Sequence, residues 1–122
     1  AEYGGQRAFA FRHIEDMRAI MEEYGDGAKQ VAIVEFGWTS DPREASDYHW
    51  HAVTEEEKAD YLVRAYRYAR ENWSPWVGLM VVVYVADPLW TPDHEQYWWA
   101  ITEPSGEPLL RPAYEALREM EK

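Results

Sequence analysis

The chain of 122 residues is long enough for one folded domain but too short for two independent cores, so residues 1–122 are expected to form a single unit. Apolar residues make up 47% of the sequence and aromatic residues 16%, which excludes a disordered protein. The formal net charge of −11 argues against nucleic acid and anionic membrane surfaces as partners. The absence of cysteine excludes disulfides and thiolate metal sites, and no apolar segment reaches membrane-spanning length.

The first third of the chain predicts a helix followed by a strand. Residues 1–8 are expected to form a loop, and after it apolar residues recur at spacings of three and four, as on one face of a helix. These residues are Phe11, Ile14, Met17, Met21 and Tyr24. Gly25 and Gly27 end the helix. Residues 31–36 form a continuous apolar run that contains Glu35, and such a run is typical of a buried parallel strand.

The rest of the chain predicts a helix, a second strand and a last helix. Thr54 and Glu57 form a capping box that opens a helix ending before Pro75. Its buried stripe is expected to be Leu62, Ala65, Tyr66, Ala69 and Trp73. Residues 77–85 predict the second strand, and Pro112 begins a helix that buries Ala113, Leu117 and Met120.

The element order is therefore helix–strand–helix–strand–helix, with long loops at residues 39–53 and 89–111. This order predicts an α/β fold whose two parallel strands are joined by a right-handed crossover and buried on both faces. Alternation along the first strand places Val31 and Ile33 on the same face as Glu35. A two-stranded parallel sheet leaves two open edges and is rarely stable in water, so something must complete it.

Glu35 is the first candidate for a functional residue. A carboxylate at the carboxyl end of an apolar strand is costly to bury without a partner, and such positions often carry chemistry. The alternative is a glutamate that has left the sheet and is solvated in a loop. The strand phase favours an at least partly buried Glu35 that points toward the axis of a barrel-like sheet.

A family resemblance becomes visible when these segments are taken together. Residues 34–38, Val-Glu-Phe-Gly-Trp, resemble the seventh-strand motif of retaining (βα)8-barrel glycoside hydrolases of the cellulase-like and xylosidase-like superfamily. Residues 54–57, 73–78, 97–101 and 111–117 agree with that family in order and spacing. The ordered set covers nearly the whole chain and is more specific than the first motif alone.

The resemblance implies that the chain is the last quarter of a (βα)8 barrel and that Glu35 occupies the nucleophile position. In that family a second acid, on the fourth strand, protonates the leaving group. This sequence contains no Asn-Glu pair to supply it, and Tyr84 stands where many relatives carry a tryptophan that floors the sugar site. The lack of an initiator methionine suggests a processed chain or a piece of a longer one.

Two further polar positions have competing interpretations. Asp87 follows the second strand, so it either approaches Glu35 as a second acid or, more simply, caps a turn before Pro88. His49 and His51 flank Trp50 and resemble a metal pair, but they lack a third ligand, so we expect polar loop residues and no metal or cofactor.

Several aromatic residues are candidates for stacking on sugar rings, although large aromatic side chains mostly serve cores. We expect Trp38, His49, Trp50, Tyr84 and Trp90 to contact a carbohydrate substrate. Trp73, Trp76 and at least one of Trp98 and Trp99 are expected to serve packing.

The sequence therefore predicts a fragment of a glycosidase-type barrel whose ancestral reaction is hydrolysis of glycosidic bonds, inactive or weakly active as an isolated chain. The alternative is a non-catalytic scaffold or carbohydrate-binding module. Other copies of the chain are the expected partners, since four copies of two strands would close an eight-stranded barrel.

Overall fold

The computed structural model describes residues 10–104 and 110–121, so the loop predicted for residues 1–8 lies outside the described residues. Within them the chain forms α1 (His13–Glu23), β1 (Val31–Phe36), the short 3-10 helix η2 (His49–His51), α2 (Glu55–Asn72), β2 (Val77–Val82), α3 (Glu95–Trp99) and α4 (Pro112–Glu119). The strands pair in parallel, which confirms the mixed α/β class and the neighbouring strands. The second strand ends at Val82 and not at residue 85, and α3 and η2 add to the predicted order.

Local signals explain where the helices begin and end. The capping box at the start of α2 is present, with Thr54 Oγ1 accepting from the Glu57 amide at 3.1 Å and the Glu57 carboxylate accepting from the Thr54 amide at 2.9 Å. After α1 the chain turns at Gly25, whose φ of +84° is the left-handed conformation that glycine adopts without a Cβ clash.

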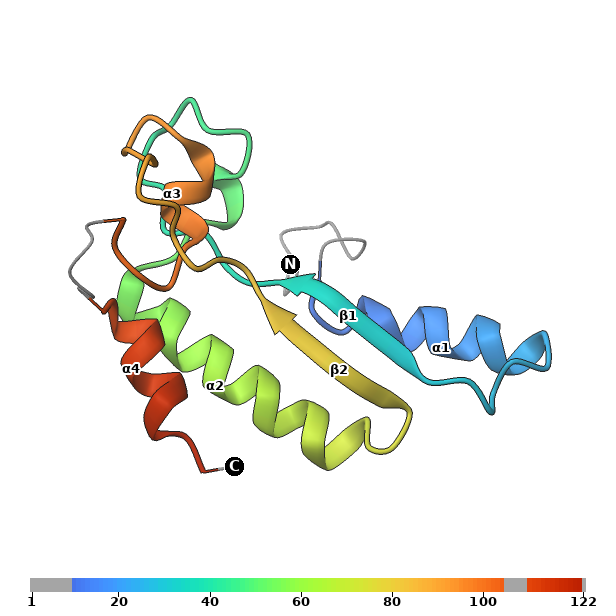
Figure 1. Cartoon of the computed structure of the whole chain (residues 1–122). Helices are drawn as coiled ribbons and strands as arrows, with labels where there is room; N and C mark the ends of the chain where they lie inside the picture. Colours follow the sequence, from blue (N-terminus) through green and yellow to red (C-terminus); the bar gives the residue numbers. More distant parts are fainter. Residues whose placement is uncertain (1–9, 105–109, 122) are drawn as a thin grey trace.

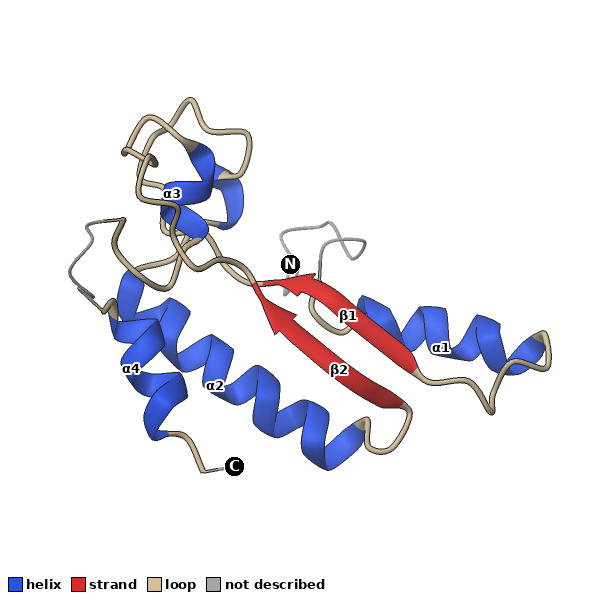
Figure 2. Ribbon diagram, viewed as in Figure 1, coloured by secondary structure: helices blue, strands red, loops and turns tan. Residues whose placement is uncertain are grey.

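The two strands lie side by side with their carboxyl ends toward the same group of loops (Figure 1). Within the described residues the sheet has these two strands alone, and each has a free edge (Figure 2). The hydrophobic core lies between β1, β2, α2 and α4. Its buried members are Ala59, Leu62, Ile101 and Ala113, and Phe36 and Val82 pack against them from the strands.

One face of the sheet carries the packing. The Phe36 ring meets Tyr66 of α2 edge-on at 5.2 Å between centroids, and the Tyr66 hydroxyl donates to the Met80 carbonyl. The pair Ile33–Met80 shares this face. The predicted buried stripe of α2 is confirmed at Leu62, Ala65, Ala69 and Trp73, while Tyr66 is half-buried. In contrast, α1 has no fully buried residue and exposes Met17, Ile20 and Tyr24.

The opposite face of the sheet is apolar and exposed. Ala32 pairs with Leu79, and alternation adds Val34 and Val81 to the same face. Val34 is 65% exposed, Leu79 52% and Val81 41%. The prediction that both faces are buried is therefore wrong for the single chain. We call these four residues the open face.

A β-bulge corrects the predicted strand phase. The four residues of β1 from Ile33 to Phe36 oppose the three of β2 from Met80 to Val82, so β1 contains one extra residue there. Phe36 consequently lies on the same face as Ile33. The sequence places Val31 and Ile33 with Glu35 on the face toward a barrel axis, but in the structure they lie on the packed face, and Ala32 and Val34 lie on the open face.

The core predicts the effect of a simple truncation. Leu62→Ala should lower the free energy of unfolding by about 2–5 kcal/mol, because Leu62 is fully buried in the core and its removal leaves a cavity. The matched control is Leu89→Ala, since Leu89 is 81% exposed and its loss should change stability by no more than about 0.5 kcal/mol. Urea denaturation followed by circular dichroism measures both, and equal effects would contradict this assignment of the core.

Candidate functional site

A groove of about 1170 Å³ opens along β1 and continues under the loops at its carboxyl end. Residues from β1, from the loop before α2, from the segment after β2, and from α3 line its loop end, while residues from the start of α1 and from α2 line its helix end. No residue of β2 lines it, so the groove follows the free edge of β1. Its loop end carries the titratable and aromatic side chains discussed next.

Glu35 stands in the groove near the end of β1. It is exposed, so the expected partial burial is not met in the single chain, although it remains within the strand. It forms no hydrogen bond or ion pair with another described residue. Gly37, two positions later, lies just after β1, where the chain passes close to Val83. A Cβ at this position would lie 3.1 Å from both the Cγ2 and the carbonyl oxygen of Val83, so glycine permits the close approach.

A second carboxylate, Glu95 at the first position of α3, lines the same groove. Its Oε1 accepts a hydrogen bond from Trp99 Nε1 at 3.1 Å. Burial raises the pKa of the Tyr84 phenol, and the negative charges of Glu35 and Glu95 raise it further. Both carboxylates therefore act on the same hydroxyl, which stays protonated and can donate a hydrogen bond at neutral pH.

Aromatic rings form the wall at the loop end. Tyr48 meets Trp99 edge-on at 5.5 Å between ring centroids, Trp50 meets His51 at 4.4 Å, and His51 lies 5.6 Å from Trp99. Burial lowers the pKa of His51, so its imidazole is neutral at pH 7. The loop before α2 and helix α3 thus build one interlocked aromatic surface.

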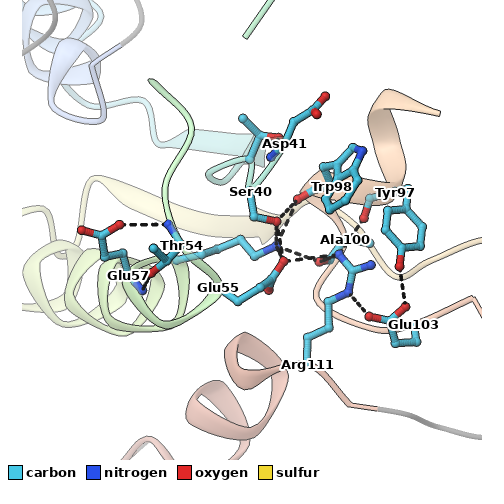
Figure 3. Close-up of polar contacts among 12 residues, drawn as sticks. Ser40, Asp41, Thr54, Glu55, Glu57, Tyr97, Trp98, Ala100, Glu103 and Arg111 are labelled. Atoms are coloured by element: carbon cyan, nitrogen blue, oxygen red, sulfur yellow. Dashed lines mark hydrogen bonds and ion pairs between the residues drawn. The ribbon is translucent and has the colours of Figure 1, made fainter. Parts of the chain in front are cut away.

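A buried ammonium group ties these loops to the helices. Lys58 Nζ lies 2.9 Å from Glu55 Oε1 and 3.2 Å from Ser40 Oγ. It also lies 3.0 Å from the Trp98 carbonyl and 3.1 Å from the Ala100 carbonyl. The Ser40 hydroxyl donates to Glu55, so the end of β1, the start of α2 and the end of α3 converge on one centre (Figure 3).

Arg111 extends this centre toward α4. Its Nε donates to Glu103 at 2.7 Å, and its Nη1 donates to the carbonyls of Tyr97 and Ala100 at 2.7 and 3.1 Å (Figure 3). The Tyr97 hydroxyl donates to the other Glu103 oxygen at 3.1 Å. Two buried cations, Lys58 and Arg111, therefore hold residues 97–103 of the segment after β2.

The loop before α2 has its own anchor in Asp41. Its buried carboxylate accepts from Arg43 Nε at 2.8 Å, from Arg43 Nη2 at 2.7 Å and from the Arg43 amide at 3.0 Å. These bonds lower the pKa of Asp41 to about 2. Arg43 also donates to the Asp93 carbonyl at 2.9 Å, which links this loop to the one that follows β2.

The structure gathers most of the predicted site residues and leaves two outside. Glu35, Trp38, Trp50 and Tyr84 line the groove. His49 is exposed in η2 and is not among the lining residues. Trp90 does not line the groove either, but its ring meets Tyr84 edge-on at 5.6 Å.

Sequence reasoning missed four groove residues, Tyr48, His51, Glu95 and Trp99. His51 was considered for metal binding and Trp99 for packing, and their aromatic character was the available signal. Nothing in the sequence distinguished Glu95, because it lies in a long acidic loop. Asp87 takes the simpler role: its Oδ1 accepts from the Leu89 amide at 2.8 Å in a turn, and it does not line the groove.

Within residues 10–104 and 110–121 no group of three or more His, Cys, Asp or Glu side chains is arranged to hold a metal ion. No helix in the same part of the chain is both long and apolar enough to cross a membrane. Comparison with known proteins finds no matching family model, no matching curated protein and no matching solved structure. Function is therefore argued from the groove itself.

The Asp41–Arg43 pair predicts a specific pH dependence of stability. A carboxyl whose pKa is lowered in the folded state stabilises the fold above its ordinary pKa of 3.8, and this contribution is lost as pH falls toward 2. Asp41→Asn should therefore cost about 2 kcal/mol near pH 6 and progressively less between pH 4 and pH 2. Unfolding in urea across this pH range measures the difference.

The control for that experiment is Asp47→Asn in the same loop, because Asp47 is exposed. It removes the same charge without removing a buried bidentate pair. A constant difference between Asp41→Asn and the unchanged protein from pH 6 to pH 2 would contradict the proposed stabilisation.

Proposed function

We propose that the chain supplies the nucleophile part of a retaining glycosidase site in a (βα)8 barrel and that Glu35 is the nucleophile. The observation that carries this proposal is the position of Glu35. It stands near the carboxyl end of a parallel strand, in a groove walled by aromatic rings, without a hydrogen bond or ion pair to any other described residue. The resemblance of residues 34–38 to a glycosidase strand motif supports the same role.

The chemistry follows from that position. The ionised Glu35 carboxylate attacks the anomeric carbon and forms a glycosyl ester, while a general acid protonates the departing oxygen. Water then hydrolyses the ester and restores the carboxylate. In retaining enzymes the two carboxyl groups lie about 5–5.5 Å apart, so the acid must come from a neighbouring strand. Aromatic rings such as Trp38 and Trp50 suit stacking on the C–H faces of a sugar.

Completion of the barrel by further copies of the chain is part of this proposal. Each aliphatic side chain of the open face that remains in water forgoes about 1.5–3 kcal/mol, against a net domain stability of only about 5–15 kcal/mol. Pairing between the free edges of β1 and β2 of different copies would satisfy the backbone, and closure of the paired strands into a barrel would bury the open face in its interior. Four copies of this two-stranded unit would supply the eight strands of such a barrel.

A non-catalytic carbohydrate-binding scaffold is the second candidate. It is favoured by the aromatic surface around Tyr48, Trp50 and Trp99, which serves binding with or without an acid catalyst.

The nucleophile assignment predicts the effect of a conservative substitution. Glu35→Gln should lower the rate of aryl glycoside hydrolysis by about a thousandfold or more, because an amide cannot form the glycosyl ester. The measurement is release of the aryl group by the purified protein across glycosides of different sugars. Glu44→Gln is the control, since Glu44 is an exposed carboxylate in the neighbouring loop and does not line the groove. Unchanged turnover in Glu35→Gln contradicts the assignment, and no turnover in any variant leaves only the binding scaffold.

The assembly proposal predicts a particle larger than one chain. Light scattering coupled to size exclusion should report a multiple of 14.4 kDa, with four chains as the expected state. Val34→Glu on the open face should shift the particle toward the single chain, because it places a charge in the proposed interface. A well-folded particle at the mass of one chain would rule out the assembly.

A further inference from the structure

The loop end of the groove is acidic. Of the described residues that line it, those with always-charged cationic side chains are Arg12 and Arg64, at the helix end. Each forms an ion pair with an acidic residue nearby in the sequence: Arg12 with Glu15 at 2.8 Å and Arg64 with Asp60 at 3.1 Å. At the loop end Glu35 and Glu95 have no ion pair within 4 Å among described residues. Burial lowers the pKa of the half-buried His51, which favours its uncharged form over a compensating positive charge.

Arg43 is the cation that approaches Glu95 from outside the groove, but it is already engaged. Its guanidinium bonds both oxygens of Asp41 and the Asp93 carbonyl. The hydrogen bond to Asp41, and to a smaller extent the charge of Glu95, raise the pKa of Arg43. The Glu95 carboxylate therefore keeps an oxygen for a ligand, while the bond from Trp99 Nε1 holds it against the aromatic surface.

The aromatic surface provides a second and independent preference for positive charge. The faces of tyrosine and tryptophan rings attract organic ammonium groups, and cages of such rings are a common way to bind them. Trp99 contacts Glu95, Tyr48 packs against Trp99, and Trp50 lines the same groove. A ligand with an acidic group would meet two carboxylates there and a chain of net charge −11.

We infer that the groove selects a sugar bearing a protonated amine, of the 2-amino-2-deoxy type, and that Glu95 is the residue that recognises the amine. This inference rests on the proposed function, in which the groove binds carbohydrate. The amine of such a sugar is attached to C2, directly beside the anomeric carbon that Glu35 would attack. Because Glu35 and Glu95 both line the loop end of the same groove, a sugar placed at Glu35 would present its C2 substituent within that acidic end.

The test uses three β-1,4-linked tetrasaccharides that differ only at C2: the glucosamine tetramer, its fully N-acetylated form and the glucose tetramer. Isothermal titration calorimetry with the full chain is performed at about pH 6, where amines are protonated and carboxylates ionised. At low salt the glucosamine tetramer should bind about tenfold or more tightly than either neutral tetramer.

Two isosteric variants separate recognition from general attraction to an acidic protein. Glu95→Gln should bring the affinity for the glucosamine tetramer to within about threefold of the affinities that the same variant has for the neutral tetramers. Its amide oxygen can still accept from Trp99, and circular dichroism checks that it folds. Glu44→Gln removes the same charge outside the groove and should keep the preference for the amine.

The outcomes distinguish this inference from the proposed function. Equal binding of the three tetramers overturns amine recognition and leaves carbohydrate binding in place. Equal losses in Glu95→Gln and Glu44→Gln also overturn it, because the attraction would then be non-specific. Binding of none of the tetramers overturns both. If tetramethylammonium binds and none of the tetramers does, the groove binds cations and not sugars, and the assignment is overturned.

Discussion

The buried ammonium of Lys58 is the contact on which the arrangement of the site depends. A lysine with no exposed side-chain surface loses its hydration, and burial accordingly lowers its pKa. The loss is offset by Glu55 together with oxygens from Ser40, Trp98 and Ala100. These partners come from the two loops and from the first turn of α2, so none can move without leaving a buried charge unsatisfied. The shape of the groove therefore depends on Lys58 and its partners.

The sequence predicted those parts of the fold that local signals determine. The capping box at Thr54 begins α2, the 3.6-residue period gives its buried stripe, and uninterrupted aliphatic runs mark both strands. Lys58 could not be predicted in the same way. It follows three glutamates in a first turn and resembles an exposed helix residue, because its carbonyl partners lie about 40 residues further along the chain.

Two other differences have the same non-local origin. The bulge between Ile33 and Phe36 depends on how β1 pairs with β2, and it brings Phe36 to the same face as Ile33. Glu95 and Trp99 join the groove because the loop after β2 folds back over β1, where Ser40 bonds the Trp98 carbonyl. Periodicity identified Glu35 as a candidate, but no local pattern could place a second carboxylate beside it.

If the sheet is completed by other copies, as proposed, the position of the groove would couple ligand binding to that assembly. Ile33, Glu35 and Phe36 of β1 line it, whereas β2 contributes nothing, so the groove borders the free edge of β1. A strand added at that edge would form another wall beside Glu35 and would bring side chains of its own to the carboxyl end of the sheet. A ligand that contacts both β1 and the added strand binds the paired chain more tightly than the unpaired chain. By linkage, it stabilises the paired state by that difference in binding free energy. In the proposed glycosidase, the free edge of β1 is therefore the side from which a general acid on an added strand would reach a sugar bound at Glu35.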